Sequence, residues 1–267
     1  MAKRRKTIIA GRLVSELIYT VAHPKDKEHV RQAKTKISTK ARCWQNLKAA
    51  CRMLELILAT NFIGKDLVVT LTYRDSDLPD TRQKAVKCLR QFMRDLRSHR
   101  KKHKQELKYL YVTESKHSEG RYHHHVVINS TGNDFDIIKS LWRYGDMIEI
   151  ENIDVRNYKA LAEYLAKEPK EAGTSNGKRM WTPSKNLDKP KQSSDWVDDR
   201  VFLEPPAGAY VLESSSEQNE FGEYIYLKYM LPDTSIDRPC RPSRKKKQNK
   251  VSFISDLKPC IYNEHRL

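Results

Sequence analysis

The sequence predicts an α+β fold in which helices pack on an antiparallel sheet. Segments rich in β-branched and apolar residues, such as 67–73, alternate with segments in which apolar residues recur every three or four positions, such as 81–104. The strand-like segments 107–114 and 122–129 are joined by a short polar link with one glycine, which favours an antiparallel hairpin. Residues 66–168 read as strand, helix, strand, strand, helix, strand, helix, an order typical of the α+β class.

The composition favours a polyanionic partner. Lys and Arg number 51 against 34 Asp and Glu, a formal net charge of +17. Nucleic acid is the first candidate and an anionic membrane surface the second. No run approaches 18 apolar residues, so we expect no membrane span, and no signal peptide follows the basic N-terminus. The five cysteines are widely spaced and form no CxxC, which indicates reduced thiols in a cytosolic protein.

The N-terminal part predicts a short strand and a long helix. The strand covers Leu13–Ala22 and ends at His23-Pro24. Residues 26–62 have helical periodicity, with a basic face that either binds phosphate or is simply solvated.

The central part contains the clearest elements. Residues 67–73 form a near-continuous apolar segment, which predicts an interior strand. Asp154 is a plausible N-cap for the last helix. The other elements are expected at Thr81–Lys104 and Asp134–Trp142 as helices, at Asp146–Ile153 as a strand, and at Val155–Lys167 as the last helix.

Signals weaken after the last helix. Arg179–Leu187 is a possible strand, and Tyr210–Glu213 and Tyr224–Leu231 are candidates for a hairpin. The chain from Pro232 is rich in Pro, Arg and Lys, which is typical of a disordered basic tail. We therefore divide the chain into an N-terminal strand and helical extension at 1–62, a central domain at 63–192, a C-terminal hairpin extension at 193–231 and a basic tail at 232–267.

Three consecutive histidines mark the candidate site. Alternate residues of a strand share a face, so His123 and His125 point one way and His124 the other. Glu114 ends the preceding strand and approaches His123 across the hairpin. Two imidazoles and a carboxylate suit Mg²⁺ or Mn²⁺ in a phosphate-processing site, and Zn²⁺ also fits. The alternative is that these histidines are only hydrogen-bonded or solvated; we expect His124 to be a packing residue.

A helical tyrosine supplies a second candidate group. Tyr164 and Lys167 are three residues apart, so they share a helix face. A phenol near a metal-bound phosphate can act as a nucleophile, and a nearby lysine lowers its pKa or offsets developing charge. Taken alone, such a tyrosine is usually a core or rim residue.

Together these residues resemble the rolling-circle replication initiators of the HUH endonuclease superfamily, of bacterial plasmid and phage type. Residues 67–73 resemble the family's apolar first motif, and residues 123–125 its His-hydrophobe-His motif. Tyr164 and Lys167 match the Tyr-x-x-Lys motif, and Glu114 falls where many members place an acidic ligand. The likeness covers about residues 66–190 and departs from the family at His124, where a bulky hydrophobe is usual.

The resemblance implies a ferredoxin-like core with a central five-stranded antiparallel sheet. It also implies a metal-dependent, single-tyrosine nicking and strand-transfer endonuclease. Tyr164 would attack single-stranded or hairpin origin DNA, become joined to its 5′-phosphate and later rejoin the strand, with His123, His125 and Glu114 holding Mg²⁺ or Mn²⁺. Host replication proteins and the bacterial cytoplasm complete this expectation. Arg121, the cation nearest the site, is either a DNA phosphate contact or a surface residue.

Other functions remain open on the sequence. A single-tyrosine transposase or conjugative relaxase would use the same chemistry, although a tyrosine that follows the histidines disfavours a relaxase. A catalytically inactive module that recognises an origin hairpin would keep the fold and lose the covalent step. An RNA-binding or membrane-surface protein is the remotest alternative.

Overall fold

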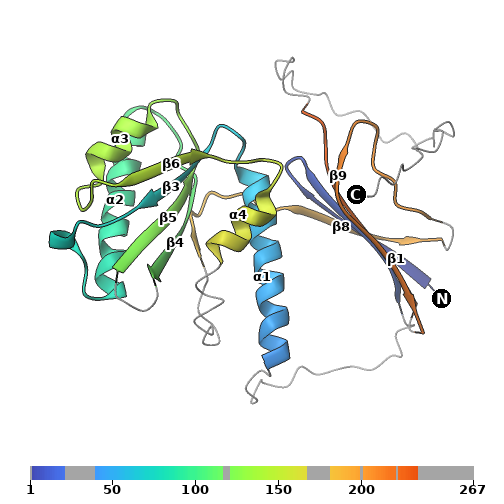
Figure 1. The fold of residues 1–267 in the computed structure, drawn as a ribbon. Coiled ribbons are helices and arrows are strands. Elements are labelled where there is room, and N and C mark those ends of the chain that lie inside the picture. The colour runs from blue at the N-terminus through green and yellow to red at the C-terminus, as the bar shows by residue number, and fades with distance from the viewer. Residues whose placement is uncertain are drawn as a thin grey trace, which may run out of the picture. The chain divides into compact units, whose positions relative to one another are not determined.

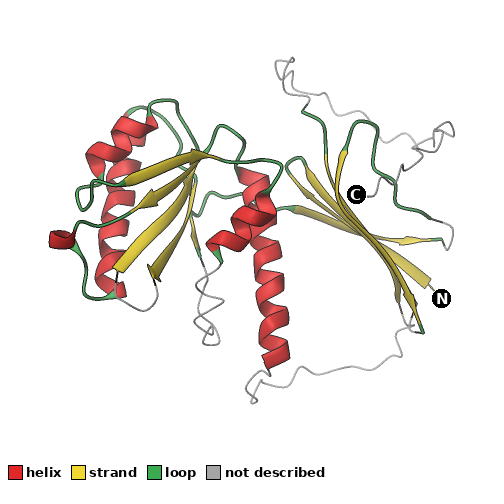
Figure 2. Ribbon diagram, viewed as in Figure 1, coloured by secondary structure: helices red, strands yellow, loops and turns green. Residues whose placement is uncertain are grey.

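A computed structural model shows two five-stranded antiparallel sheets and four α-helices in the part of the chain that it describes (Figures 1 and 2). The structure describes residues 2–21, 40–116, 121–166, 181–198, 201–220 and 222–233, without the side chains of Lys40, Cys43 and Lys116. The predicted α+β class is confirmed.

The central sheet carries the candidate site. Its strand order is β6-β3-β5-β4-β7 and every pairing is antiparallel. The chain order β3-α2-β4-β5-α3-β6 is that of a ferredoxin-like fold, so the predicted five-stranded antiparallel sheet is confirmed. The strands are β3 (Leu67–Leu71), β4 (Tyr109–Lys116), β5 (Arg121–Ile128), β6 (Ile148–Asn152) and β7 (Thr182–Pro183).

Two helices cover one face of this sheet. They are α2 (Arg82–Lys102) and α3 (Asp134–Leu141), and a short 3₁₀ turn, η1 (Asp75–Asp77), precedes α2. Thr81 caps α2 by accepting a hydrogen bond from the backbone N–H of Lys84. The apolar stripe of α2, including Leu89 and Phe92, packs with inward residues of β3 and β5 in one buried cluster.

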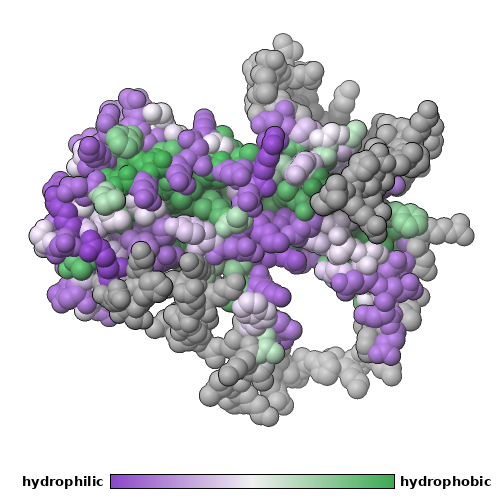
Figure 3. All heavy atoms as spheres, in the orientation of Figure 1, coloured by the Kyte–Doolittle hydropathy of each residue, from purple (hydrophilic) through white to green (hydrophobic). Residues whose placement is uncertain are grey.

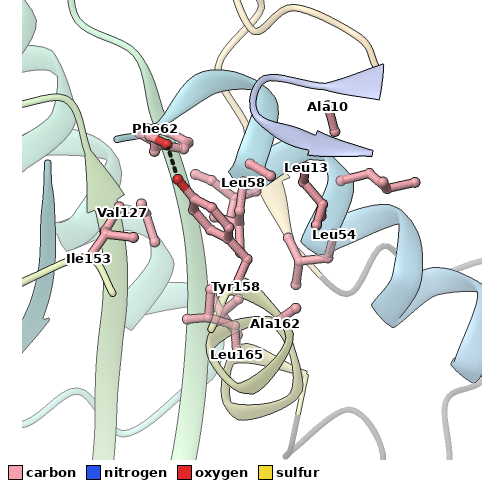
Figure 4. Packing of buried hydrophobic residues seen from close by; sticks show 14 of the residues in the cluster. Ala10, Leu13, Leu54, Leu58, Phe62, Val127, Ile153, Tyr158, Ala162 and Leu165 are labelled. Carbon is pink, nitrogen blue, oxygen red and sulfur yellow. Dashed lines mark hydrogen bonds between the residues drawn. The ribbon is translucent and has the colours of Figure 1, made fainter. Parts of the chain in front are cut away.

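The other face of the sheet meets α4 (Tyr158–Leu165) and α1 (Lys40–Asn61). Tyr158 is buried between them, and its hydroxyl donates a hydrogen bond of 2.6 Å to the carbonyl of Phe62, just beyond α1 (Figure 4). Leu165 from α4, Leu58 from α1 and Val127 from β5 join the same cluster. This packing fixes the position of α4 over the sheet.

The second sheet is assembled from both ends of the described chain. Its strand order is β8-β1-β2-β10-β9, from β1 (Ala2–Ala10), β2 (Leu13–Val21), β8 (Lys191–Val197), β9 (Tyr210–Asn219) and β10 (Gly222–Met230). The turn between β1 and β2 lies against α1. Gly11 has a φ of +59°, and a Cβ there would come within 2.2 Å of the carbonyl oxygen of Ala59. Only glycine suits this close approach.

Comparison with the expected elements gives several confirmations and one error. The strand at β2 and the β9–β10 hairpin are confirmed, although the hairpin strands are longer than expected. Strands β1 and β8 were not predicted. The N-cap prediction was wrong: α4 begins at Tyr158 and Asn157 caps it, because the Asp154 side chain accepts a hydrogen bond from the nearer Arg156 N–H.

Some expectations fall outside the described residues. These are the first part of the long helix expected at 26–62, the basic tail beyond residue 233, and Lys167. The described part of that helix is α1. The proposed division into a central domain and extensions stays a prediction; strands from residues 1–62 and 193–231 share one sheet, together with β8.

The edge of the central sheet at β6 has two unlike sides. Hydrophobic residues gather over β6 in the view of Figure 3, and Ile148 and Ile150 pack against the α2 cluster. Glu149 and Glu151 alternate with them, and Glu149 is paired in register with Thr70. None of the helices in the described ranges has the length and apolarity needed to cross a bilayer.

A buried ion pair joins α2 to α3. Arg100, fully buried in the last turns of α2, lies 2.6 Å from the carboxylate of Asp134, which is also buried. Arg100 also donates to the carbonyl of Asn129, and Asp134 accepts hydrogen bonds from Ser130 and Thr131. The pair therefore holds the turn that follows β5.

Replacing Arg100 with Met is expected to lower the free energy of unfolding by about 3–5 kcal/mol, because Asp134 then stays buried without its cation. Urea denaturation measures this change. The control is Lys84→Met, which breaks the exposed 2.8 Å pair with Asp80. Equal, small losses for both variants would contradict the account.

Candidate active site

The pairing of β4 with β5 brings three potential metal ligands together. Glu114 is the register partner of His123. The Nε2 atoms of His123 and His125 lie 3.2 and 3.3 Å from Oε2 of Glu114. One ligand atom from each residue falls within 4.8 Å of the others. These three side chains are called the triad below.

The triad has an acceptor that lacks a partner. Oε1 of Glu114 is buried and makes no hydrogen bond within the described structure. Burial raises the pKa of Glu114, but hydrogen bonds from His123 and His125 and their charge outweigh it and lower the pKa to about 2. The group is therefore a carboxylate with an unused buried oxygen. A divalent cation would satisfy that oxygen, so the residues fit a metal site.

Thr70 orients the buried member of the triad. Its hydroxyl lies 3.2 Å from Nδ1 of His125, and the two residues are register partners on β3 and β5. When Nδ1–H donates to the hydroxyl, Nε2 presents its lone pair toward Glu114, where a cation would bind.

His124 points to the opposite face, as expected for a packing residue. It is fully buried, with Nε2 2.8 Å from the Tyr73 hydroxyl and Nδ1 2.9 Å from the Thr113 hydroxyl. Its ring packs edge-on against Tyr73 and Trp142. Burial, followed by the charges of His123 and His125, lowers its pKa to about 3. The imidazole is thus neutral and both its nitrogens have partners.

Tyr164 of α4 lies beside the triad. Its ring centroid is 4.8 Å from that of His125, and its hydroxyl is 3.4 Å from Nε2 of His125. The side chain is 47% exposed. Burial raises its pKa, and the negative charges of Glu114, Glu149 and Glu151 raise it further. The phenol is therefore protonated, accessible and next to a potential metal site.

Tyr158 has a different environment, although it belongs to the same helix. Its ring is buried and its hydroxyl is bonded to the Phe62 carbonyl, and burial raises its pKa to about 12. Within the described part of α4, Tyr164 alone offers a phenol to the triad, as the single-tyrosine interpretation requires.

The two predicted cations are not part of this cluster. Arg121 is exposed at the start of β5, and its guanidinium lies 2.7 Å from the carboxylate of Asp75 in η1. A DNA phosphate would have to compete with that carboxylate. Lys167 lies outside the described residues, so its distance from Tyr164 is not described.

Sequence reasoning missed Thr70, Glu149 and Glu151. Thr70 was available as the polar residue in an otherwise apolar strand segment, but its partner depends on the β3–β5 register. The two glutamates alternate with isoleucines on β6, and that pattern indicates that they share a face. Which face it is depends on the pairing of β6 with β3.

A comparison with protein families gives a match over the central sheet. Residues 66–169 match a family of replication-associated proteins, described as that of the ORF2 type. This range contains Glu114, His123, His125 and Tyr164. The resemblance to replication-associated proteins is confirmed for this segment and is consistent with a rolling-circle replication initiator. No curated protein and no solved structure matches the chain.

The environment of His124 predicts acid sensitivity. The unfolded chain binds a proton at this imidazole near pH 6.5, whereas the folded chain does so only near 3. The stability contributed by neutral His124 is therefore present above about pH 6.5 and declines as the pH falls toward about 3. His124→Leu should flatten this decline in urea unfolding with EDTA present. The exposed His103→Leu is the control, and an unchanged slope for His124→Leu would contradict the assignment.

Proposed function

We propose, from the family match over residues 66–169 and the site within it, that this protein initiates rolling-circle replication by nicking single-stranded origin DNA through Tyr164. One observation supports the proposal most strongly. The Tyr164 hydroxyl lies 3.4 Å from His125, a member of a Glu-His-His group able to hold a metal ion. A nucleophile and a cation site are thus side by side in a replication-associated segment.

The triad suits a hard divalent cation. His123, His125 and Glu114 would hold Mg²⁺ or Mn²⁺, and Zn²⁺ is compatible with the same ligands. When bound, such a cation withdraws charge from a phosphoryl oxygen and helps to orient the scissile phosphate. Three protein ligands leave coordination positions open for that oxygen and for water.

The reaction follows from the nucleophile. The Tyr164 oxygen forms a bond to the scissile phosphorus and the phenol loses its proton. The bond from phosphorus to the 3′ oxygen breaks, and that oxygen takes up a proton to become a 3′-OH. The 5′-phosphate remains on Tyr164. Attack by a 3′-OH reverses these steps and rejoins a strand, so the phosphodiester bond energy is conserved and ATP is not required.

Charge at the site must change before this step. Three carboxylates raise the pKa of Tyr164, which opposes loss of the phenolic proton. A cation at the triad would offset Glu114, and Lys167, three residues beyond Tyr164, is proposed to offset the developing charge. Nicking should therefore depend strictly on the divalent ion.

The same proposal names the partners. The net charge of +17 suits single-stranded or hairpin origin DNA, and Arg121 is proposed to contact its phosphate. Host replication proteins would extend the released 3′-OH in the bacterial cytoplasm. A transposase or relaxase would share this chemistry, whereas an inactive origin-binding module would form no covalent product.

Tyr164→Phe is expected to abolish the covalent product, because it removes the attacking oxygen. The wild type, incubated with labelled single-stranded origin DNA and Mn²⁺, should form an adduct that survives denaturing electrophoresis and is lost in EDTA. His123→Ala and His125→Ala should reduce it strongly. Tyr122→Phe is the matched control, since that phenol packs with the cluster on the other face. An adduct formed equally by Tyr164→Phe would refute the proposal.

Thr70→Val is expected to weaken Mn²⁺ binding by about 10- to 100-fold, because loss of a partner that orients a metal-bound histidine has that size of effect. Isothermal titration measures the affinity. Thr113→Val is the matched control, because Thr113 bonds His124 on the opposite face. Equal affinities in the two variants would count against a role for Thr70 in orienting His125.

A further inference from the structure

One row of side chains crosses four strands of the second sheet and combines aromatic rings with a cation. Arg4 of β1 is the register partner of Trp196 on β8 and of Tyr19 on β2, and Tyr19 is the partner of Tyr224 on β10. Register partners in antiparallel strands point to the same face. The row therefore places three rings and a guanidinium over about 14 Å, from strand spacings near 4.8 Å. We call it the aromatic row.

The aromatic row is accessible. Trp196 is 63% exposed and Tyr224 37% exposed. The guanidinium of Arg4 lies over the Trp196 ring, 5.4 Å from its centroid, and its Nε atom makes no hydrogen bond within the described structure. A large exposed indole beside a stacked guanidinium is an unusual way to finish a sheet face that only supports a fold.

The next row on the same face leads into a basic hollow beneath α1. Lys6 lies two residues from Arg4 and so shares its face. Lys6 and Tyr226 line a hollow of about 460 Å³ together with Lys48 and Arg52 of α1. The Arg52 guanidinium lies 5.4 Å above the centroid of the Tyr226 ring. Cations and rings thus continue from the aromatic row into the hollow.

The opposite face of the sheet has a different character. Its cations are matched by carboxylates, as in the pairs of Lys3 with Glu223 and of Arg5 with Glu16. Its apolar residues Val14, Leu227 and Tyr229 form a buried cluster. The exposed rings and stacked cations therefore belong to one face, which distinguishes them from the general basicity of the chain.

We propose that the aromatic row is a binding platform for single-stranded DNA, separate from the tyrosine site. Unpaired bases can stack on Trp196 and Tyr224, while Arg4 and the cations of the hollow neutralise the phosphates. Duplex DNA would satisfy the cations but could not present free base faces to the rings. This platform goes beyond the proposed nicking reaction and would hold strand outside the scissile site.

The test measures affinity for a fluorescein-labelled oligothymidylate by anisotropy, in EDTA and with the Tyr164→Phe protein, so that cleavage plays no part. Trp196→Ala and Tyr224→Ala should each weaken binding about tenfold, the usual value of one base stacked on an aromatic side chain. Trp196→Phe should retain most of the affinity because it keeps a ring. Arg4→Gln should reduce the slope of log Kd against log salt by about 0.7.

Controls separate the platform from general effects. Phe202→Ala removes an aromatic side chain that is 78% exposed but lies outside the row, and it should leave affinity unchanged. A duplex of the same length should respond weakly to Trp196→Ala. Thermal unfolding of each variant shows whether the substitution simply destabilises the sheet.

Several outcomes would overturn the platform. They are wild-type affinity in Trp196→Ala and Tyr224→Ala, an equal loss in Phe202→Ala, an equal loss for duplex DNA, or a loss in Trp196→Phe as large as in Trp196→Ala. Failure of the platform is distinguishable from failure of the proposed nicking activity. Adduct formation on a short oligonucleotide with Mn²⁺, in proteins that retain Tyr164, tests the second alone.

Discussion

The register of β4 against β5 is the constraint on which the candidate site depends. It places Glu114 opposite His123, and strand alternation then puts His125 on the same face. A slip of one residue would turn both histidines into the α2 cluster and bring His124 to the α4 side. The register is secured by unlike environments. His124 is neutral, buried and bonded to Tyr73 and Thr113, while His123 and His125 are bonded to a carboxylate.

The position of α4 is the second requirement, and a different tyrosine provides it. The Tyr158 hydroxyl is bonded to the Phe62 carbonyl, and Leu165 packs into the cluster shared with α1 and the turn between β1 and β2. Because these contacts fix one side of the helix, Tyr164 is presented on another side, beside His125. A buried ion pair of 2.5 Å between Lys228 of β10 and Glu55 of α1 adds support from the second sheet. Scaffold and nucleophile thus come from one short helix.

Local patterns predicted the central part of this structure well. Periodicity gave β3, α2 and the β4–β5 hairpin, and alternation separated His124 from its neighbours. Long-range pairing was not accessible in the same way. Residues 2–10 are basic, and nothing local shows that β1 pairs with β8, nearly the whole described chain away. The partner of Thr70 and the face of Glu149 likewise follow from register between distant strands. The capping error arose because Asp154 and Asn157 both suit an N-cap, and only packing of Tyr158 decides where α4 begins.

The most direct measurement is anomalous diffraction from crystals of the protein soaked with Mn²⁺. The account predicts one strong peak bonded by an imidazole nitrogen of His123, an imidazole nitrogen of His125 and the carboxylate of Glu114, with the Tyr164 hydroxyl facing it. A peak bonded by His124, or no peak at the triad under conditions that support binding in solution, would contradict the central claim.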